Sequence, residues 1–190
     1  MLSEKLGHSL DKPLARVAGK IPFSPNAITI AGFALTLLSG PVLAFDLRLG
    51  AFCMLPAGLL DMLDGIVARV QGKKSAYGAF LDSVLDRYSD AVILLAVAWN
   101  LGRGGNMAGV ALSGVTLAGS FIISYVRARA ESLGASCTHG IMERPDRLIL
   151  LFLGAVLGYM TEALWILAVL THITVIQRIH HTRRQLIRTE

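Results

Sequence analysis

Long apolar runs constrain the fold of this chain more than any other feature. Residues 27–45 are almost wholly apolar, and a helix of that length crosses a hydrocarbon core of about 30 Å. Hydrophobic residues make up 54% of the 190 positions and charged residues only 16%, whereas soluble domains carry about 25% charge. The sequence therefore predicts an all-α integral membrane protein.

The apolar runs number six, and each predicts a transmembrane helix. They cover residues 27–45, 51–60 (continuing into a group of acids), 76–101, 107–126, 148–159 and 163–176. The third is polar in its first half, and the last two are short runs that polar ends extend. Residues 1–20 place leucines at near-helical spacing between lysines, which predicts an amphipathic segment on the membrane surface; a soluble tail is the alternative. We expect this juxtamembrane segment to precede one six-helix domain, residues 21–190.

The positive charges predict an orientation. Of the 18 Lys and Arg residues, 15 fall on the N-terminal segment, the 69–74 loop, the 127–147 region and the tail from Arg178. With an even number of spans these segments share one side of the membrane. The positive-inside bias then places both termini and the acidic group at the cytoplasmic face.

Four carboxylates in two pairs form the acidic group between the second and third runs. Asp61 and Asp64 are three residues apart, and Asp82 and Asp86 are four apart, so each pair shares a helix face. Two antiparallel helices joined by a short loop would bring all four together. Charged residues in membrane helices are costly and commonly functional. This stretch is therefore the predicted active site.

Oxygen ligands without nearby histidine or cysteine favour Mg²⁺ or Mn²⁺, and four acids suit two ions. Close carboxylates cannot all stay ionised without such cations, and paired ions commonly assist phosphoryl-type displacement. Two alternatives remain. The acids could be structural partners of Arg69 and Arg87, or they could bind a cation in transit through a divalent-cation transporter. A transporter predicts acids along a path through the bilayer, whereas these are concentrated at one face.

The spacing of the acids and their neighbours resembles the signature of the CDP-alcohol phosphatidyltransferases. All eight fixed positions of that signature are present: Asp61, Asp64, Gly65, Ala68, Arg69, Gly78, Asp82 and Asp86. The resemblance implies a membrane enzyme that displaces CMP from a CDP-linked lipid with an alcohol. It implies a metal pair held by Asp61, Asp64 and Asp82 with Asp86 near it, and Asp86 as the general base. The implied nucleotide pocket is lined by Asn26, Thr29, Asp61, Gly65, Arg69, Ser75 and Gly78.

Arginines in the second half of the chain predict an anionic acceptor, since guanidinium groups pair well with phosphate. The segments SYVRARAES, ERPDRL and QRIH resemble the branch of the family that uses inositol 1-phosphate. That resemblance implies that Arg127, Arg147 and Arg178 hold the acceptor phosphate, although the branch more often has lysine at position 127. Glycerol 3-phosphate is the close alternative, and a free alcohol would not need the arginines. The resemblance also implies a homodimer, and we expect no nucleic-acid partner.

Overall fold

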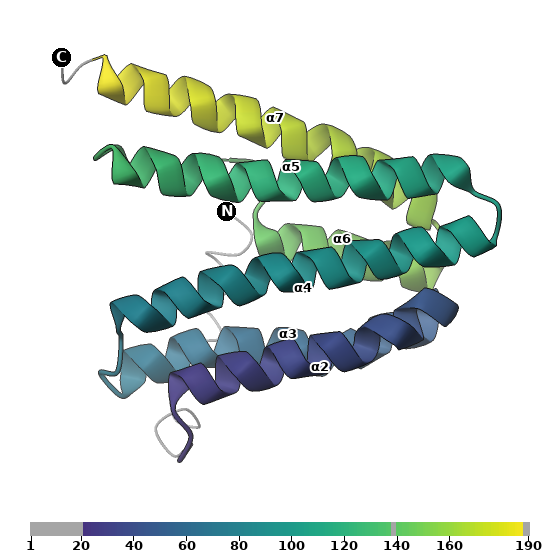
Figure 1. Ribbon diagram of the computed structural model, residues 1–190, viewed down its shortest axis with the longest axis horizontal. Coiled ribbons are helices and arrows are strands. Elements are labelled where there is room, and N and C mark those ends of the chain that lie inside the picture. Colours follow the sequence, from purple (N-terminus) through teal and green to yellow (C-terminus); the bar gives the residue numbers. More distant parts are fainter. Residues whose placement is uncertain (1–20, 138–139, 188–190) are drawn as a thin grey trace. The chain divides into compact units, whose positions relative to one another are not determined.

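The computed structural model describes residues 21–137 and 140–187, and every regular element in these ranges is an α-helix (Figure 1). The predicted amphipathic segment, residues 1–20, lies outside the described residues. The six helices are α2 (Pro25–Phe45), α3 (Leu47–Val70), α4 (Ala76–Arg103), α5 (Met107–Ser132), α6 (Arg144–Leu157) and α7 (Met160–Leu186). The six predicted runs each fall on one of them, which confirms an all-helical fold with six helices in the described residues.

Short polar side chains set where several helices begin. The Ser24 hydroxyl accepts a hydrogen bond from the Ala27 backbone N–H, and Pro25 follows as the first residue of α2. The Asp46 carboxylate accepts from the Leu49 N–H at 3.0 Å and starts α3. Such side chains satisfy backbone donors that the first helical turn leaves without partners. Asp46 also ends α2, where its backbone N–H donates to the Val42 carbonyl, so this single residue separates α2 from α3.

The chain forms two compact units, Met1–Ala96 and Val97–Glu190, and the boundary lies within α4. In the first unit, α2 packs along α3, as Figure 1 shows for the two helices at the start of the colour scale. Gly50 permits this hairpin, because a Cβ there would overlap the backbone of Leu43. Ile28, Ile66 and Val67 form a buried apolar cluster between the two helices.

In the second unit, α7 packs against both α5 and α6. Leu164 and Leu167 of α7 are fully buried. Gly119 of α5 lies directly on Thr171, and a Cβ at Gly154 of α6 would come within 2.7 Å of the Ala163 Cβ. Small residues of this kind allow close approach of helices in membranes.

Among the helices of residues 21–137 and 140–187, four are long and apolar enough to cross a membrane: α2, α3, α5 and α7. Helix α4 has 28 residues, enough for about 42 Å, but Asp82, Asp86, Arg87 and Asp90 all lie within its first fifteen residues. Helix α6 has 14 residues and covers about 21 Å, less than the core of a bilayer. Membrane crossing by α4 and α6 therefore stays a prediction.

Candidate active site

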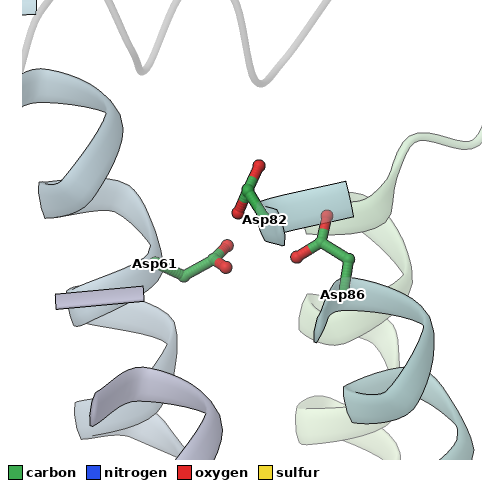
Figure 2. A group of neighbouring side chains, drawn as sticks. All are labelled: Asp61, Asp82 and Asp86. Atoms are coloured by element: carbon green, nitrogen blue, oxygen red, sulfur yellow. The ribbon is translucent and has the colours of Figure 1, made fainter. Parts of the chain in front are cut away.

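Three of the four predicted acids meet at one point in the first unit. Asp61 extends from α3, and Asp82 and Asp86 extend from consecutive turns of α4. One carboxylate oxygen of each lies within 4.8 Å of those of the other two, and Figure 2 shows the three groups pointing toward one another. All three are half-buried. We call Asp61, Asp82 and Asp86 the acid triad.

Asp64 lies beside the triad and faces a different helix. It is only 7% exposed, and its Oδ2 accepts a hydrogen bond of 2.7 Å from the Thr29 hydroxyl of α2. Asp61 and Asp82 are near enough to act on it electrostatically. Asp64 therefore links the acid triad to the first turns of α2.

A cleft of about 260 Å³ opens next to the triad, also within the first unit. Its walls are the start of α2, the end of α3, the 71–75 connection and the start of α4. Six of the seven predicted nucleotide-binding residues line it: Asn26, Thr29, Gly65, Arg69, Ser75 and Gly78. The seventh, Asp61, belongs to the triad instead. Asp82 is common to the cleft and the triad, so the two features form one continuous site.

Gly78 shapes the floor of this cleft. The Ser75 hydroxyl accepts a hydrogen bond from the Gly78 N–H at 3.0 Å and so caps the start of α4. A Cβ at Gly78 would lie 2.9 Å from the Asn26 Oδ1 and 3.0 Å from the Ser75 Oγ. Only glycine lets α4 begin this close to Asn26 without displacing a polar side chain from the cleft.

Two charged residues of the cleft were not among the predicted site residues. Lys73 and Lys74 line the cleft from the connection between α3 and α4, and with Arg69 they place three cations along it. The carboxylates of Asp64 and Asp82 also line the cleft. The available signal was the pair of adjacent lysines in a loop that joins two acidic helices.

The three predicted acceptor arginines all lie in the second unit. Arg147 and Arg178 are each 5% exposed, and Arg178 Nη1 donates a hydrogen bond of 2.8 Å to the Ile123 carbonyl of α5. Arg127 is half-exposed and pairs with Glu131 at 2.9 Å. Arg127 and Arg147 both act electrostatically on Arg178, so the unit gathers arginines from α5, α6 and α7.

Comparison with known families decides what this site belongs to. The model of the CDP-alcohol phosphatidyltransferase family matches residues 23–177. The chain belongs to this family. It is therefore a multi-pass integral membrane enzyme, and the transporter alternative is set aside. The match spans the helices that carry the acid triad and the cleft as well as most of the second unit.

Named relatives and solved structures agree over nearly the full length. The archaetidylinositol phosphate synthase of Pyrococcus horikoshii is 36% identical over 191 residues, covering 98% of each chain. A crystal structure of Mycobacterium tuberculosis phosphatidylinositol phosphate synthase with CDP-DAG bound has a TM-score of 0.77 and 31% identity, and the match covers 92% of this chain and 94% of that one. The same synthase in complex with manganese and citrate also has a TM-score of 0.77 and 31% identity, covering 90% and 88%.

Proposed function

We propose that this enzyme transfers a phosphatidyl group, or its archaeal ether counterpart, from a CDP-linked lipid to a hydroxyl of inositol 1-phosphate. The hydroxyl oxygen forms a bond to the lipid-bearing phosphorus, and the bond from that phosphorus to the bridging oxygen of CMP breaks. CMP leaves, and the hydroxyl proton passes to a base on the enzyme. The product is a phosphatidylinositol phosphate.

The observation that carries this proposal is the continuity of the acid triad with the cationic cleft through Asp82. A CDP-linked lipid has a diphosphate between its nucleoside and its lipid. The Arg69, Lys73 and Lys74 side chains suit that anion, since phosphate pairs strongly with guanidinium and ammonium groups. The acids then lie next to the phosphorus that reacts.

The donor set of the triad fits a divalent cation. Three carboxylate oxygens within 4.8 Å of one another, with no nitrogen or sulfur donor in the group, are typical of Mg²⁺ or Mn²⁺ sites. Asp61, Asp82 and Asp86 would hold the ion, and Asp64 beside them could serve a second one. When bound, such ions neutralise negative charge on the phosphate oxygens during displacement.

Asp86 is the proposed general base. It lies one turn beyond Asp82 at the edge of the triad, and the Arg87 guanidinium lies 3.7 Å from its Oδ2. A carboxylate here can accept the proton from the attacking hydroxyl as the new bond forms. Thr29 holds Asp64 in place, and Gly78 leaves room for Asn26 and the nucleotide.

The acceptor assignment rests on the second unit and on the relatives. Arg147 and Arg178 are buried cations, and buried arginine near other arginines suits a phosphate better than a neutral alcohol. The named relatives at 33–36% identity are inositol phosphate synthases of the archaetidyl or phosphatidyl type. Glycerol 3-phosphate shares the phosphate and stays the second candidate.

The membrane orientation is also part of the proposal. The described cations near the acid triad, Arg69, Lys73 and Lys74, follow the positive-inside pattern. The active site then faces the cytoplasm, with both termini on the same side. The homodimer that the resemblance implies stays a prediction.

The test is CMP release by the detergent-purified enzyme with CDP-diacylglycerol and Mn²⁺. We expect release only when an alcohol phosphate is present, faster with inositol 1-phosphate than with glycerol 3-phosphate, and abolished by EDTA. Faster release with glycerol 3-phosphate would assign the enzyme to the other acceptor. Absence of release with every acceptor would refute the proposed function.

A further inference from the structure

A hydrogen bond from Gln71 joins two chain segments that border the cleft. Its Nε2 donates to the Ile21 carbonyl at 2.9 Å. Gln71 is the residue after α3 and stands in the sequence between two cations of the cleft, Arg69 and Lys73. Ile21 lies shortly before Pro25, the first residue of α2 and itself a lining residue of the cleft. The bond therefore connects the end of α3 with the entry to α2.

The backbone around Gln71 is held by the way in which α3 ends. The Gly72 N–H donates to the Arg69 carbonyl at 3.4 Å, and φ at Gly72 is +64°. The Lys73 N–H donates to the Ala68 carbonyl at 3.0 Å. Two such bonds around a left-handed glycine are a common way to end a helix. The Gln71 side chain therefore extends toward Ile21 from a backbone of fixed position.

Ile21 attaches the entry to α2 to the rest of the first unit. Its side chain packs against the buried cluster of Ile28, Ile66 and Val67, and its carbonyl accepts the Gln71 bond. The next three residues, 22–24, are exposed, and Ser24 then caps α2 by accepting from the Ala27 N–H. The position of this exposed segment and of the cap that follows it therefore depends on how Ile21 is held.

Asn26 is the cleft residue that this attachment affects most. It lies in the first turn of α2, directly after Pro25, and a Cβ at Gly78 would come within 2.9 Å of its Oδ1. Thr29 lies further into α2 and has its own hydrogen bond to Asp64. Helix ends fray before the helix interior does. A weaker attachment of Ile21 should therefore displace Asn26 and leave the Thr29–Asp64 bond in place.

We propose that Gln71 is a positioning residue for nucleotide binding. Through the Ile21 carbonyl it holds the first turn of α2, and Asn26 with it, beside the end of α3. Gln71 begins the 71–75 connection, and the cleft-lining residues of that connection are Lys73, Lys74 and Ser75. Gln71 thus acts through the backbone rather than by contact with the substrate. This inference rests on the proposed function, since it assumes that the cleft takes the nucleotide of the CDP-linked lipid.

The experiment measures the KM for CDP-diacylglycerol, the inhibition constant of CMP, kcat and Mn²⁺ activation in the full-length enzyme. Gln71→Met keeps the approximate size of the side chain and removes the donor to Ile21. We expect the KM and the inhibition constant to rise together by about three- to tenfold, the loss typical of one hydrogen bond. Because the acid triad and the Thr29–Asp64 bond are unchanged, kcat and the Mn²⁺ concentration at half-maximal rate should stay within about twofold.

A second variant and a matched control complete the set. Ile21→Ala removes the apolar attachment of the same segment, and it should raise the same two constants as Gln71→Met. In the second unit, Gln177 Oε1 accepts a hydrogen bond of 3.2 Å from the Ile141 N–H. Gln177→Met therefore makes the same substitution and removes one bond far from the cleft in the sequence. It should leave the KM for CDP-diacylglycerol and the inhibition constant of CMP at the wild-type values.

A double variant tests whether Gln71 acts through Asn26. If the Gln71 bond serves to place Asn26, its loss has no further effect once that side chain is truncated. Asn26→Ala alone and Asn26→Ala combined with Gln71→Met should then share one KM for CDP-diacylglycerol. Independent residues would instead multiply their effects on KM, and full multiplication would overturn the proposed route through Asn26.

The outcomes separate this inference from the function beneath it. A wild-type enzyme that releases CMP, with Gln71→Met at the wild-type KM for CDP-diacylglycerol, would overturn the positioning role alone, whatever Ile21→Ala does. A parallel loss of kcat and of Mn²⁺ activation in Gln71→Met would overturn it as well, since that indicates general damage to the first unit. A wild-type enzyme that releases no CMP with any acceptor refutes the proposed function, and the positioning role falls with it.

Discussion

The hydrogen bond from the Thr29 hydroxyl to Asp64 allows a direct test of the proposed metal site. The hydroxyl lies 2.7 Å from Oδ2 of Asp64, which is 7% exposed. Thr29→Val keeps the shape of the side chain and removes this donor. A hydrogen bond to a charged group contributes about 1.5–3 kcal/mol. The Gly65 backbone also bonds Asp64, so we take the lower end, about 1.5 kcal/mol, which corresponds to roughly tenfold in affinity.

Loss of the Thr29–Asp64 hydrogen bond should raise the Mn²⁺ concentration that the enzyme needs for activity. Asp64 lies beside Asp61 and Asp82, so a carboxylate released from Thr29 weakens the ion site through its neighbours. The assay is CMP release at saturating CDP-diacylglycerol over a range of Mn²⁺ concentrations. We expect the Mn²⁺ concentration at half-maximal rate to rise about tenfold in Thr29→Val, following the estimate for one charged hydrogen bond.

Thr36 provides the matched control. It lies two turns further along α2, is 6% exposed, and its hydroxyl donates to the Gly32 carbonyl of its own helix at 3.2 Å. Thr36→Val should leave Mn²⁺ activation within twofold. Equal effects of the two variants would refute the link from Thr29 to Asp64. A rise confined to the KM for CDP-diacylglycerol would assign the Thr29 hydroxyl to the nucleotide instead.

Three further variants test the remaining roles. Asp86→Asn should lower kcat by about 10²–10⁴, the range for a lost general base, while equilibrium binding of CDP-diacylglycerol persists; near-normal turnover would remove Asp86 as the base. Replacing Lys73 and Lys74 together by Gln should raise the KM for CDP-diacylglycerol about tenfold or more, as expected for two charged contacts, and an unchanged KM would place the diphosphate elsewhere. Arg147→Ala should raise the acceptor KM at least tenfold with little change for the lipid, and the opposite pattern would show that the acceptor site is misplaced.

The fold was largely legible from the sequence because its signals are local. Apolar runs of sufficient length predict helices in a membrane. In the structure, the side chains of Ser24, Asp46 and Asn106 cap the starts of three of these helices. Helix α4 was harder to classify, since the acids that make it functional also lower its hydropathy. Whether α4 crosses the membrane depends on where its polar half lies relative to the membrane–water interface. No local sequence pattern specifies that position.

Asp61 and Asp64 contact different helices, which their spacing in the sequence could not predict. Residues three apart on a helix differ by about 60° around its axis, so they share a face and still point at different neighbours. Asp61 faces α4 and joins the triad, whereas Asp64 faces Thr29 of α2. Which acid meets which helix depends on where α2 and α4 lie relative to α3, and that is a tertiary property.

The cations were harder to interpret than the acids. A positive-inside loop carries lysine and arginine whatever else it does, so the adjacent lysines Lys73 and Lys74 fit an orientation signal as well as a binding site. The arginines of the second unit are open to the same two interpretations, and only the resemblance singled out Arg127, Arg147 and Arg178. Burial separates them: Arg147 and Arg178 are withdrawn from solvent, which is unusual for arginine unless its charge is used or paired. The sequence could not show that difference.

Arg127 differs from the two buried arginines, and its environment yields a last prediction. Its Nε bonds Glu131 at 2.9 Å, and both side chains are about half exposed. An exposed pair at this helical spacing contributes only about 0.3–0.5 kcal/mol, so a phosphate could displace Glu131 at a cost of about twofold in affinity. Glu131→Gln should therefore lower the acceptor KM by no more than about twofold and increase its dependence on ionic strength. If the acceptor KM rises instead, Glu131 orients Arg127 for the acceptor, and the pair works as a unit.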